Sequence, residues 1–135
     1  EPFLVSASVR AFIAQRLVRK LCPKCRQETE YAPEYLRSVN FPIHHARPFY
    51  KPGGCQDCRH SGYKGRMAIY EVCLLTGPVQ ELVAAGRPDT AIREQAIKDG
   101  FVPMRVYGYN KVMQGETTLE EVVSVTTTEM AAIGF

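Results

Sequence analysis

The amino-acid sequence predicts an α+β fold that is mainly α-helical, and three patterns along the chain support this prediction. Two Cys-x-x-Cys pairs, at residues 22–25 and 55–58, bracket 29 other residues. Residues 66–75 alternate in the manner of a strand, and the last third of the chain has apolar residues at helical spacing. We therefore expect a four-cysteine module, then a strand, and then a small helical bundle.

The first element expected from the sequence is an amphipathic helix over residues 8–21. Apolar residues recur there at helical spacing, and basic residues crowd the last turns, where cations complement the helix dipole. Ser6 or Ser8 would cap this helix, and Pro23 would end it. The helix would deliver Cys22 to the module. Because the chain opens inside this pattern, we expect it to continue from an upstream domain of a longer protein.

The two cysteine pairs predict a zinc-ribbon-like metal site. Each turn can point two sulfurs at one ion, and four thiolates supply the tetrahedral geometry of closed structural zinc sites. The expected ligands are Cys22, Cys25, Cys55 and Cys58. Glycines beside the second pair suit the tight turns that such a site needs. A closed four-thiolate site leaves no position for a substrate, so the zinc would be structural.

Other uses of these cysteines stay open at this point. Scattered thiols fit poorly, because four of the five cysteines share one spacing. A disulfide framework usually needs an oxidising compartment and a small chain, whereas this one has 135 residues, is 45% hydrophobic and shows no signal peptide. A thioredoxin-like redox pair would follow a strand and open a helix in a βαβ unit, and we expect neither Cys-x-x-Cys pair to lie in such a unit. His44, His45 or His60 could replace a ligand, although four thiolates already complete the tetrahedron.

On these grounds the chain divides into three parts. Residues 1–21 precede the module, residues 22–66 form it, and residues 67–135 hold the strand and a helical subdomain. In the loop between the cysteine pairs, Pro33 would begin a short helix. The aromatic residues of this loop would form a small apolar patch of their own, made of Tyr31, Tyr35, Phe41, Phe49 and Tyr50.

The last third of the chain is expected to follow its strand with four helices. In the strand, Glu71 could pair with a basic residue or lie at an exposed edge, and Cys73 would be a small core residue. The expected helices run over 76–85, from Asp89 or Thr90 to Gly100, from Pro103 to Gly115, and onward from a capping box at 117–120. The tail after residue 126 would fray.

The charge of the chain is unevenly distributed, although its net charge is only +3. Residues 1–66 carry a net charge of +7 and residues 67–135 a net charge of −4. A basic half could contact nucleic acid, an acidic protein surface or anionic lipid, or it could be a solvated face or dock on the acidic half of the same chain. The sequence has no apolar run of the ~18 residues that would predict a membrane-spanning helix.

The sequence contains no recognisable catalytic motif. It has no G-x-x-x-x-G-K-[ST] loop to hold phosphates, no G-x-S-x-G, no H-E-x-x-H and no convincing Ser/His/Asp set. The residues therefore predict a metal site without catalytic machinery.

Several segments resemble bacterial type II secretion and type IV pilus assembly ATPases. Residues 14–25, Ala-Gln-Arg-Leu-Val-Arg-Lys-Leu-Cys-Pro-Lys-Cys, resemble the segment that leads into the tetracysteine motif of that family. Residues 55–71, with Cys-x-x-Cys, Gly-Tyr-Lys-Gly-Arg and Ile-Tyr-Glu, are similar to its second half. Residues 111–122 resemble the C-terminal helical signature, and residues 1–5 look like the piece that follows the nucleotide-site motifs. The similarity is weaker over residues 100–109.

The resemblance implies that the chain is the C-terminal part of a hexameric ATPase, a homohexamer that is cytoplasmic and peripheral at the inner membrane. The parent protein would bind ATP and Mg²⁺ through motifs upstream of residue 1 and dock on inner-membrane platform proteins. It would couple ATP hydrolysis to assembly of a type IV pilus or a type II secretion pseudopilus. The fragment itself would be non-catalytic and would contact its own upstream nucleotide-binding domain, and no nucleic acid is expected.

Two functions of other classes stay open from the residues alone. A thiol redox or metal-sensing protein would need an exposed cysteine of low pKa. A stand-alone zinc-ribbon module could bind nucleic acid through basic side chains interleaved with stacking aromatics. The residues available for this are Lys51, Arg59, Lys64 and Arg66 with Phe49, Tyr50 and Tyr63.

Overall fold

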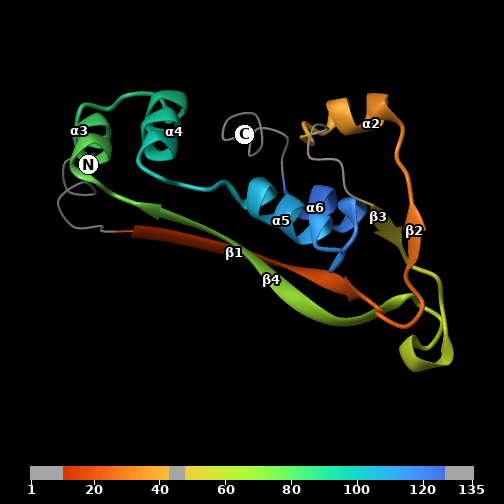
Figure 1. Cartoon of the computed structure of the whole chain (residues 1–135). Coiled ribbons are helices and arrows are strands. Elements are labelled where there is room, and N and C mark those ends of the chain that lie inside the picture. Colours follow the sequence, from red (N-terminus) through yellow and green to blue (C-terminus); the bar gives the residue numbers. More distant parts are fainter. Residues whose placement is uncertain (1–10, 43–47, 127–135) are drawn as a thin grey trace.

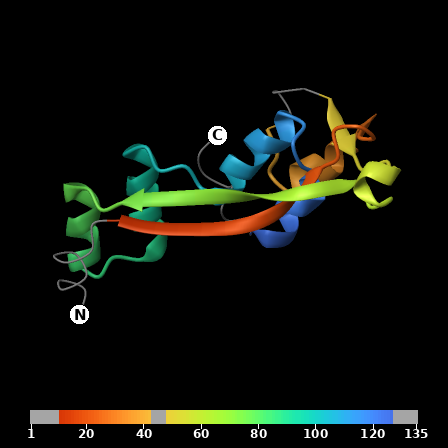
Figure 2. The ribbon, with the colours of Figure 1, turned by 90° about the horizontal axis from the view of Figure 1, so that it is seen from below.

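A long two-stranded antiparallel ribbon is the backbone of the fold. The structure is a computed structural model that describes residues 11–42 and 48–126. In it, β1 (Ala11–Leu21) pairs with β4 (Tyr63–Leu74), from Ala11 opposite Leu74 to Leu21 opposite Tyr63. The labelled α-helices all lie on one side of this ribbon (Figure 1). Seen from below, the ribbon therefore lies in front of them (Figure 2).

The helix predicted over residues 8–21 is wrong, because the described part of that segment is the strand β1. Its apolar residues fit either period, and both faces of the segment carry some of them. The alternation that turns Val18 toward the helices, where it is 1% exposed, turns Leu17 and Ile13 away. Pairing with β4, some fifty residues away along the chain, decides the outcome, and a local pattern cannot reveal such a partner. The proposed caps Ser6 and Ser8 lie outside the described residues.

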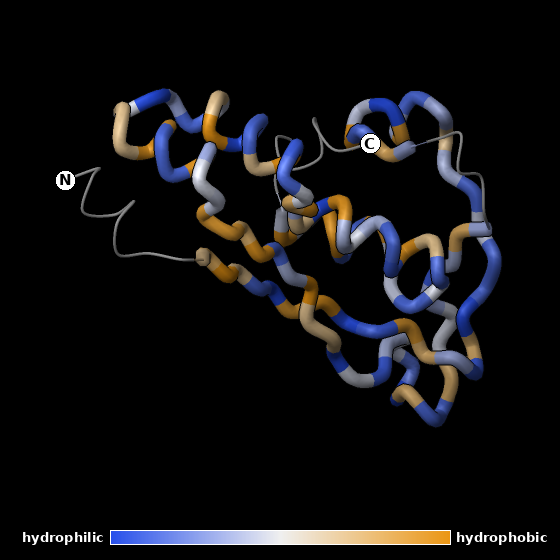
Figure 3. The backbone as a smooth tube through the Cα atoms, turned by 60° about the vertical axis from the view of Figure 1, so that its left-hand side comes forward, coloured by the Kyte–Doolittle hydropathy of each residue, from blue (hydrophilic) through white to orange (hydrophobic). Residues whose placement is uncertain are grey.

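The main core lies between the ribbon and two helices, α5 (Met104–Met113) and α6 (Leu119–Val125). Ile69 of β4 is fully buried there. A methyl group on Gly108 would come within 2.5 Å of the side chain of Val122 and 3.4 Å of Ile69. The glycine therefore lets α5 approach both α6 and β4 closely. Apolar and polar segments alternate along both strands of the ribbon (Figure 3).

A second, smaller core lies at the far end of the ribbon, where α3 (Gly77–Ala84) packs against α4 (Asp89–Lys98). Its buried members are Leu75, Val79 and Ala96. The C-terminal helices are thus divided between two cores and do not form one small bundle. The four predicted helices and the predicted strand are present in the described residues.

None of the described helices combines the length and apolar character that crossing a bilayer requires.

The described part of the loop between the cysteine pairs is folded and packs on the main core. It contains β2 (Gln27–Thr29), α2 (Pro33–Ser38) and β3 (Phe49–Lys51), and β2 pairs with β3. Pro33 begins α2 as predicted. The predicted aromatic patch joins the core, because Phe41 lies between Phe49 and Tyr109 of α5, with centroid distances of 5.1 and 4.9 Å.

Two smaller expectations about residues near the helices are refined by the structure. Glu71 is half-buried and forms no ion pair with a basic residue in the part of the chain that the structure describes. Its carboxylate accepts a hydrogen bond of 2.8 Å from the N–H of Met104, the first residue of α5. Thr118, and not Thr117, caps α6 by accepting from the N–H of Glu121 at 3.2 Å. The tail after residue 126 lies outside the described residues.

Candidate metal centre

The four paired cysteines converge at one end of the ribbon. Their Sγ atoms all lie within 4.8 Å of one another. The Sγ atoms of Cys22 and Cys55 are 3.8 Å apart, those of Cys25 and Cys58 are 3.7 Å apart, and those of Cys55 and Cys58 are 3.7 Å apart. A tetrahedral zinc ion with Zn–S bonds of ~2.3 Å requires sulfur atoms about 3.8 Å apart. The cluster therefore has the dimensions of a tetrathiolate zinc site.

The ribbon, and not a helix, delivers Cys22 to this cluster. Cys22 follows directly on β1, and its N–H donates to the carbonyl of Gly62, next to the start of β4, at 2.9 Å. Cys55 immediately precedes the short 3₁₀ helix η1 (Gln56–Cys58), and Cys58 is its last residue. Because β1 and β4 are paired, the two cysteine turns are held side by side.

Backbone N–H groups point at the sulfur atoms of two of the cysteines. Burial of the Cys58 thiol opposes its ionisation, but the N–H groups of Cys55 and Gly62 donate to its Sγ at 3.3 and 3.1 Å and lower its pKa to about 6. The N–H of Gly54 donates to Cys25 at 3.2 Å and lowers its pKa, but burial and the neighbouring thiols outweigh this and raise the pKa to about 11. The donors to Cys58 favour the thiolate that a metal ion needs.

Two glycines are required by the turns around the cluster. Gly62 has a φ of 80°, and a side chain there would overlap Pro52. A side chain at Gly53 would overlap the carbonyl oxygen of Cys25. Arg59 and His60 also adopt left-handed φ angles, of 54° and 64°, which shows how sharply the chain turns after Cys58.

The alternatives considered for the cysteines are less consistent with this geometry. All five are free thiols, so the described chain contains no disulfide. Cys22 does follow a strand, but the chain then enters β2 rather than the helix that a thioredoxin-like pair would open. His60 is exposed and outside the cluster, and His44 and His45 lie outside the described residues. Cys73 packs partly against the second core, where burial raises its pKa.

The turn from α5 into α6, residues 115–121, fastens the cysteine module to the helices, a role that sequence analysis did not anticipate. Arg26 donates to the carbonyl of Gly115 at 2.5 Å, and its guanidinium lies 4.2 Å from the ring centre of Tyr50. The N–H of Leu21 donates to the carbonyl of Glu116 at 2.9 Å. Gly115 lies in the left-handed region with a φ of 78°, and a side chain there would meet Arg26 and Tyr50.

The same turn also holds β1 and the start of β4 through side chains. Glu121 accepts hydrogen bonds from the N–H of Arg19 at 2.7 Å and from its guanidinium at 2.9 Å. Thr117 donates to the carbonyl of Arg19 at 2.7 Å, and the hydroxyls of Tyr63 and Thr118 are 3.1 Å apart. The polar Gly-Glu-Thr-Thr stretch after a helical pattern was the available signal in the sequence, but its partners lie 55 to 102 residues earlier in the chain.

Aromatic residues of the module are engaged within the protein. The ring of Phe49 packs on Tyr31, at a centroid distance of 4.9 Å, and on Phe41. The guanidinium of Arg19 lies 4.0 Å from the ring centre of Tyr63. Rings engaged in this way offer little face for stacking with bases, so nucleic-acid binding is not favoured.

Comparison with known proteins places the chain in a family. A sequence profile described as type II/IV secretion system protein matches residues 1–124. The type IV pilus assembly ATPase PilB of Myxococcus xanthus is 43% identical over 129 residues, which cover 93% of this chain and 23% of that protein. Type II secretion system protein E of Aeromonas hydrophila is 38% identical over 126 residues, covering 93% and 25%. PilB of Pseudomonas aeruginosa is 44% identical over 126 residues, covering 92% and 22%.

These matches run almost from end to end of the chain, and the chain spans a quarter or less of the length of these three relatives. The cysteine cluster and the 115–121 turn both lie inside the matched range. The chain therefore belongs to the type II/IV secretion system protein family.

Proposed function

We propose that Cys22, Cys25, Cys55 and Cys58 hold one structural zinc ion, which stabilises the module of residues 22–66. The observation that carries this proposal is the match between their Sγ separations, 3.7 and 3.8 Å, and the edge of a tetrahedral zinc–thiolate site. Four sulfur ligands fill the coordination sphere of the ion. The zinc would thus have no open position for a substrate and would act on folding alone.

The ion would stabilise more than its own ligands. The loop that it closes contributes three buried residues to the main core, Leu36, Val39 and Phe41. Structural zinc supplies on the order of 10 kcal/mol of apparent folding free energy in small domains. Loss of the ion would therefore release β2, β3 and α2 and weaken the core beneath them, whereas the second core around α3 and α4 lies apart from the module.

The protein to which this chain belongs would be a homohexameric ATPase of type II secretion or type IV pilus assembly. The names of its relatives support this assignment. ATP and Mg²⁺ would bind outside residues 1–135, in a nucleotide-binding domain of the full-length protein. The hexamer would be cytoplasmic, lie at the inner membrane and act on platform proteins there, while the present region would contribute structure rather than catalysis.

The exposed apolar residues of the ribbon support contact with that nucleotide-binding domain. On the face of the ribbon that points away from the helices, Ile13 and Leu17 of β1 are 71% and 51% exposed, and Val72 and Leu74 of β4 are 44% and 61% exposed. Ile13 and Val72 are direct cross-strand neighbours, so they form part of one continuous apolar surface. Clustered apolar side chains of this kind usually mark a contact surface.

The zinc proposal is tested by a matched pair of cysteine variants of the chain. Cys55→Ser removes a ligand, and Cys73→Ser removes the one cysteine outside the cluster. We expect one zinc per chain in the wild type and in Cys73→Ser, and loss of zinc together with a large fall in Tm in Cys55→Ser. Unchanged zinc content and Tm in Cys55→Ser would overturn the proposal.

The ATPase assignment is tested separately in the full-length protein. That protein should hydrolyse ATP, and cells carrying Cys55→Ser should fail in secretion or piliation while cells carrying Cys73→Ser succeed. A full-length protein without ATP hydrolysis would overturn the enzymatic role and would leave the zinc proposal standing.

A further inference from the structure

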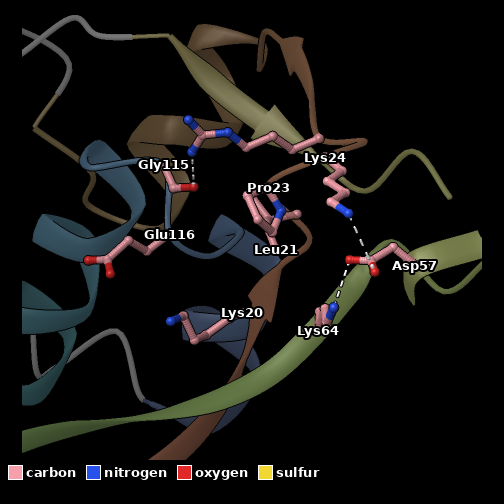
Figure 4. A pocket seen from close by; sticks show the side chains of 9 residues that line it. Lys20, Leu21, Pro23, Lys24, Asp57, Lys64, Gly115 and Glu116 are labelled. Carbon is pink, nitrogen blue, oxygen red and sulfur yellow. Dashed lines mark hydrogen bonds and ion pairs between the residues drawn. The ribbon is translucent and has the colours of Figure 1, made fainter. Parts of the chain in front are cut away.

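A pocket of about 490 Å³ lies where the cysteine module meets the 115–121 turn. We call it the basic pocket. Figure 4 shows its labelled side chains, with Leu21 and Pro23 in the middle and lysines around them. Its volume falls within the range of small-molecule sites, roughly 300–1,000 Å³. The residues that line it are Lys20, Leu21, Pro23, Lys24, Arg26, Asp57, Lys64, Gly115 and Glu116.

Cations outnumber anions in the lining. Four of the nine residues are Lys or Arg, whereas Asp57 and Glu116 are the two carboxylates. Asp57 is shared between two lysines, since its carboxylate lies 2.7 Å from the ammonium of Lys64 and 3.7 Å from that of Lys24. One carboxylate cannot neutralise two ammonium groups, so an excess of positive charge remains on this side of the pocket.

Lys20 adds a further charge with no internal partner. Within the described residues its ammonium forms no hydrogen bond and no ion pair, and it lies beside the pocket in Figure 4. Glu116, the carboxylate on that side, is already paired with Lys111 at 3.6 Å. The pocket thus combines one uncompensated ammonium with a lysine pair held by a single carboxylate.

A purely electrostatic account of these lysines is the main competitor. A zinc ion with four thiolates carries a net charge of −2, and nearby cations would stabilise it without binding any ligand. That account requires neither a pocket nor apolar side chains between the cations. Pro23, which is exposed, supplies such an apolar surface in the middle of the lining, beside the buried Leu21.

We propose that the basic pocket binds a small, soluble organic phosphate. Its phosphate group would lie among the ammonium groups of Lys20, Lys24 and Lys64, since ammonium groups are effective point-charge partners of phosphate oxygens. Its organic part would lie on the exposed ring of Pro23. Because the lining comes from both the module and the 115–121 turn, the bound ligand would join these two parts and stabilise the module.

Phenyl phosphate, inorganic phosphate and phenol are suitable probes, because they separate the charged from the apolar contribution. Each is titrated at constant ionic strength into the 135-residue chain, purified without chelators, while backbone amide shifts are followed by NMR. We expect phenyl phosphate to bind more tightly than inorganic phosphate, to shift the amides of Leu21 and Glu116, and to raise Tm. Phenol should leave these amides unchanged.

Three charge variants complete the test. Lys20→Gln should weaken phenyl phosphate binding about threefold to fivefold, the change expected for one exposed ion pair. Glu116→Gln should strengthen it, because it removes a repelling carboxylate. Lys98→Gln, an exposed change on α4 at the far end of the ribbon, is the matched control and should have no effect. The proposal is overturned if phenyl phosphate leaves the pocket amides unshifted, if Lys20→Gln binds as tightly as the control, or if phenyl phosphate binds no better than inorganic phosphate.

Discussion

Replacement of Glu121 by Gln tests whether the 115–121 turn fastens β1 to the helices. Glu121 is the third residue of α6, its side chain is 15% exposed, and it accepts hydrogen bonds from both the N–H and the guanidinium of Arg19. Gln keeps one oxygen acceptor of similar shape but loses the charge. The variant therefore removes the electrostatic part of the contact and leaves the packing in place.

The expected loss in the free energy of unfolding is about 1–2 kcal/mol. A hydrogen bond to a charged group contributes about 1.5–3 kcal/mol and a neutral one about 0.5–1.5 kcal/mol, so the N–H bond alone loses about 1 kcal/mol. The ion pair adds less than ~1 kcal/mol, because the side chain of Arg19 is 55% exposed to solvent. The loss of a carboxylate in the first turn of α6 acts in the same direction.

The pH dependence of this contact has a defined sign. Burial raises the pKa of Glu121, but the hydrogen bonds from Arg19 outweigh it and hold the pKa below its usual value of 4.5. A carboxyl group with a lowered pKa in the folded state stabilises the protein above its unfolded pKa. That stabilisation is lost as the pH falls through the folded pKa. The difference between wild type and Glu121→Gln should therefore be complete at pH 7 and shrink below about pH 4.5.

Urea denaturation at several pH values measures this difference, with Glu94→Gln as the matched control on the exposed surface of α4. Any release of metal at low pH affects all three proteins, so it cancels in the comparison. An unfolding midpoint at pH 7 equal to that of the control would refute the role of Glu121. A difference that persists unchanged to pH 3 would refute its electrostatic origin.

Three further predictions concern the module and the helix that covers the ribbon. Gly62→Ala should destabilise the protein far more than Gly65→Ala, because both glycines have φ near 80° but only Gly62 would gain a steric overlap; Tm values of the two variants measure this, and equal losses would contradict it. Glu71→Gln should cost about 0.5–2 kcal/mol, since it weakens the cap at the start of α5, and a urea midpoint equal to that of wild type would exclude that role. Zinc affinity should fall as the pH is lowered, because each thiol must lose its proton to bind metal, and the fall should become steeper below about pH 6, where the Cys58 thiol, whose pKa is about 6, is protonated as well; a chelator competition that is flat from pH 7 to pH 5 would contradict this.

The sequence predicted those parts of the fold whose signals are local. The strand at 66–75 and the helices at 76–85, 89–100 and 103–115 have complete patterns with start and stop residues, and the structure has them with shifts of only a few residues at their ends. The clustering of the four cysteines was also predicted, because two identical spacings strongly restrict where the sulfur atoms can lie.

The features that could not be predicted depend on distant partners. Residues 11–21 carry apolar residues compatible with either period, and only the pairing of Ala14 with Glu71 and of Val18 with Met67 makes them a strand. The role of the 115–121 turn is set by Arg19 and Arg26, which lie 102 and 89 residues before their partners in the turn. A sequence pattern shows that such a turn exists, but not what it contacts.

X-ray absorption spectroscopy at the zinc edge of the purified protein tests the central claim most directly. With one zinc ion held by Cys22, Cys25, Cys55 and Cys58, the first shell should contain four sulfur atoms at about 2.3 Å and no nitrogen or oxygen. A shell with a nitrogen or oxygen ligand would contradict the closed tetrathiolate site and its purely structural role. Protein purified under reducing, chelator-free conditions that shows no zinc signal would contradict the metal centre altogether.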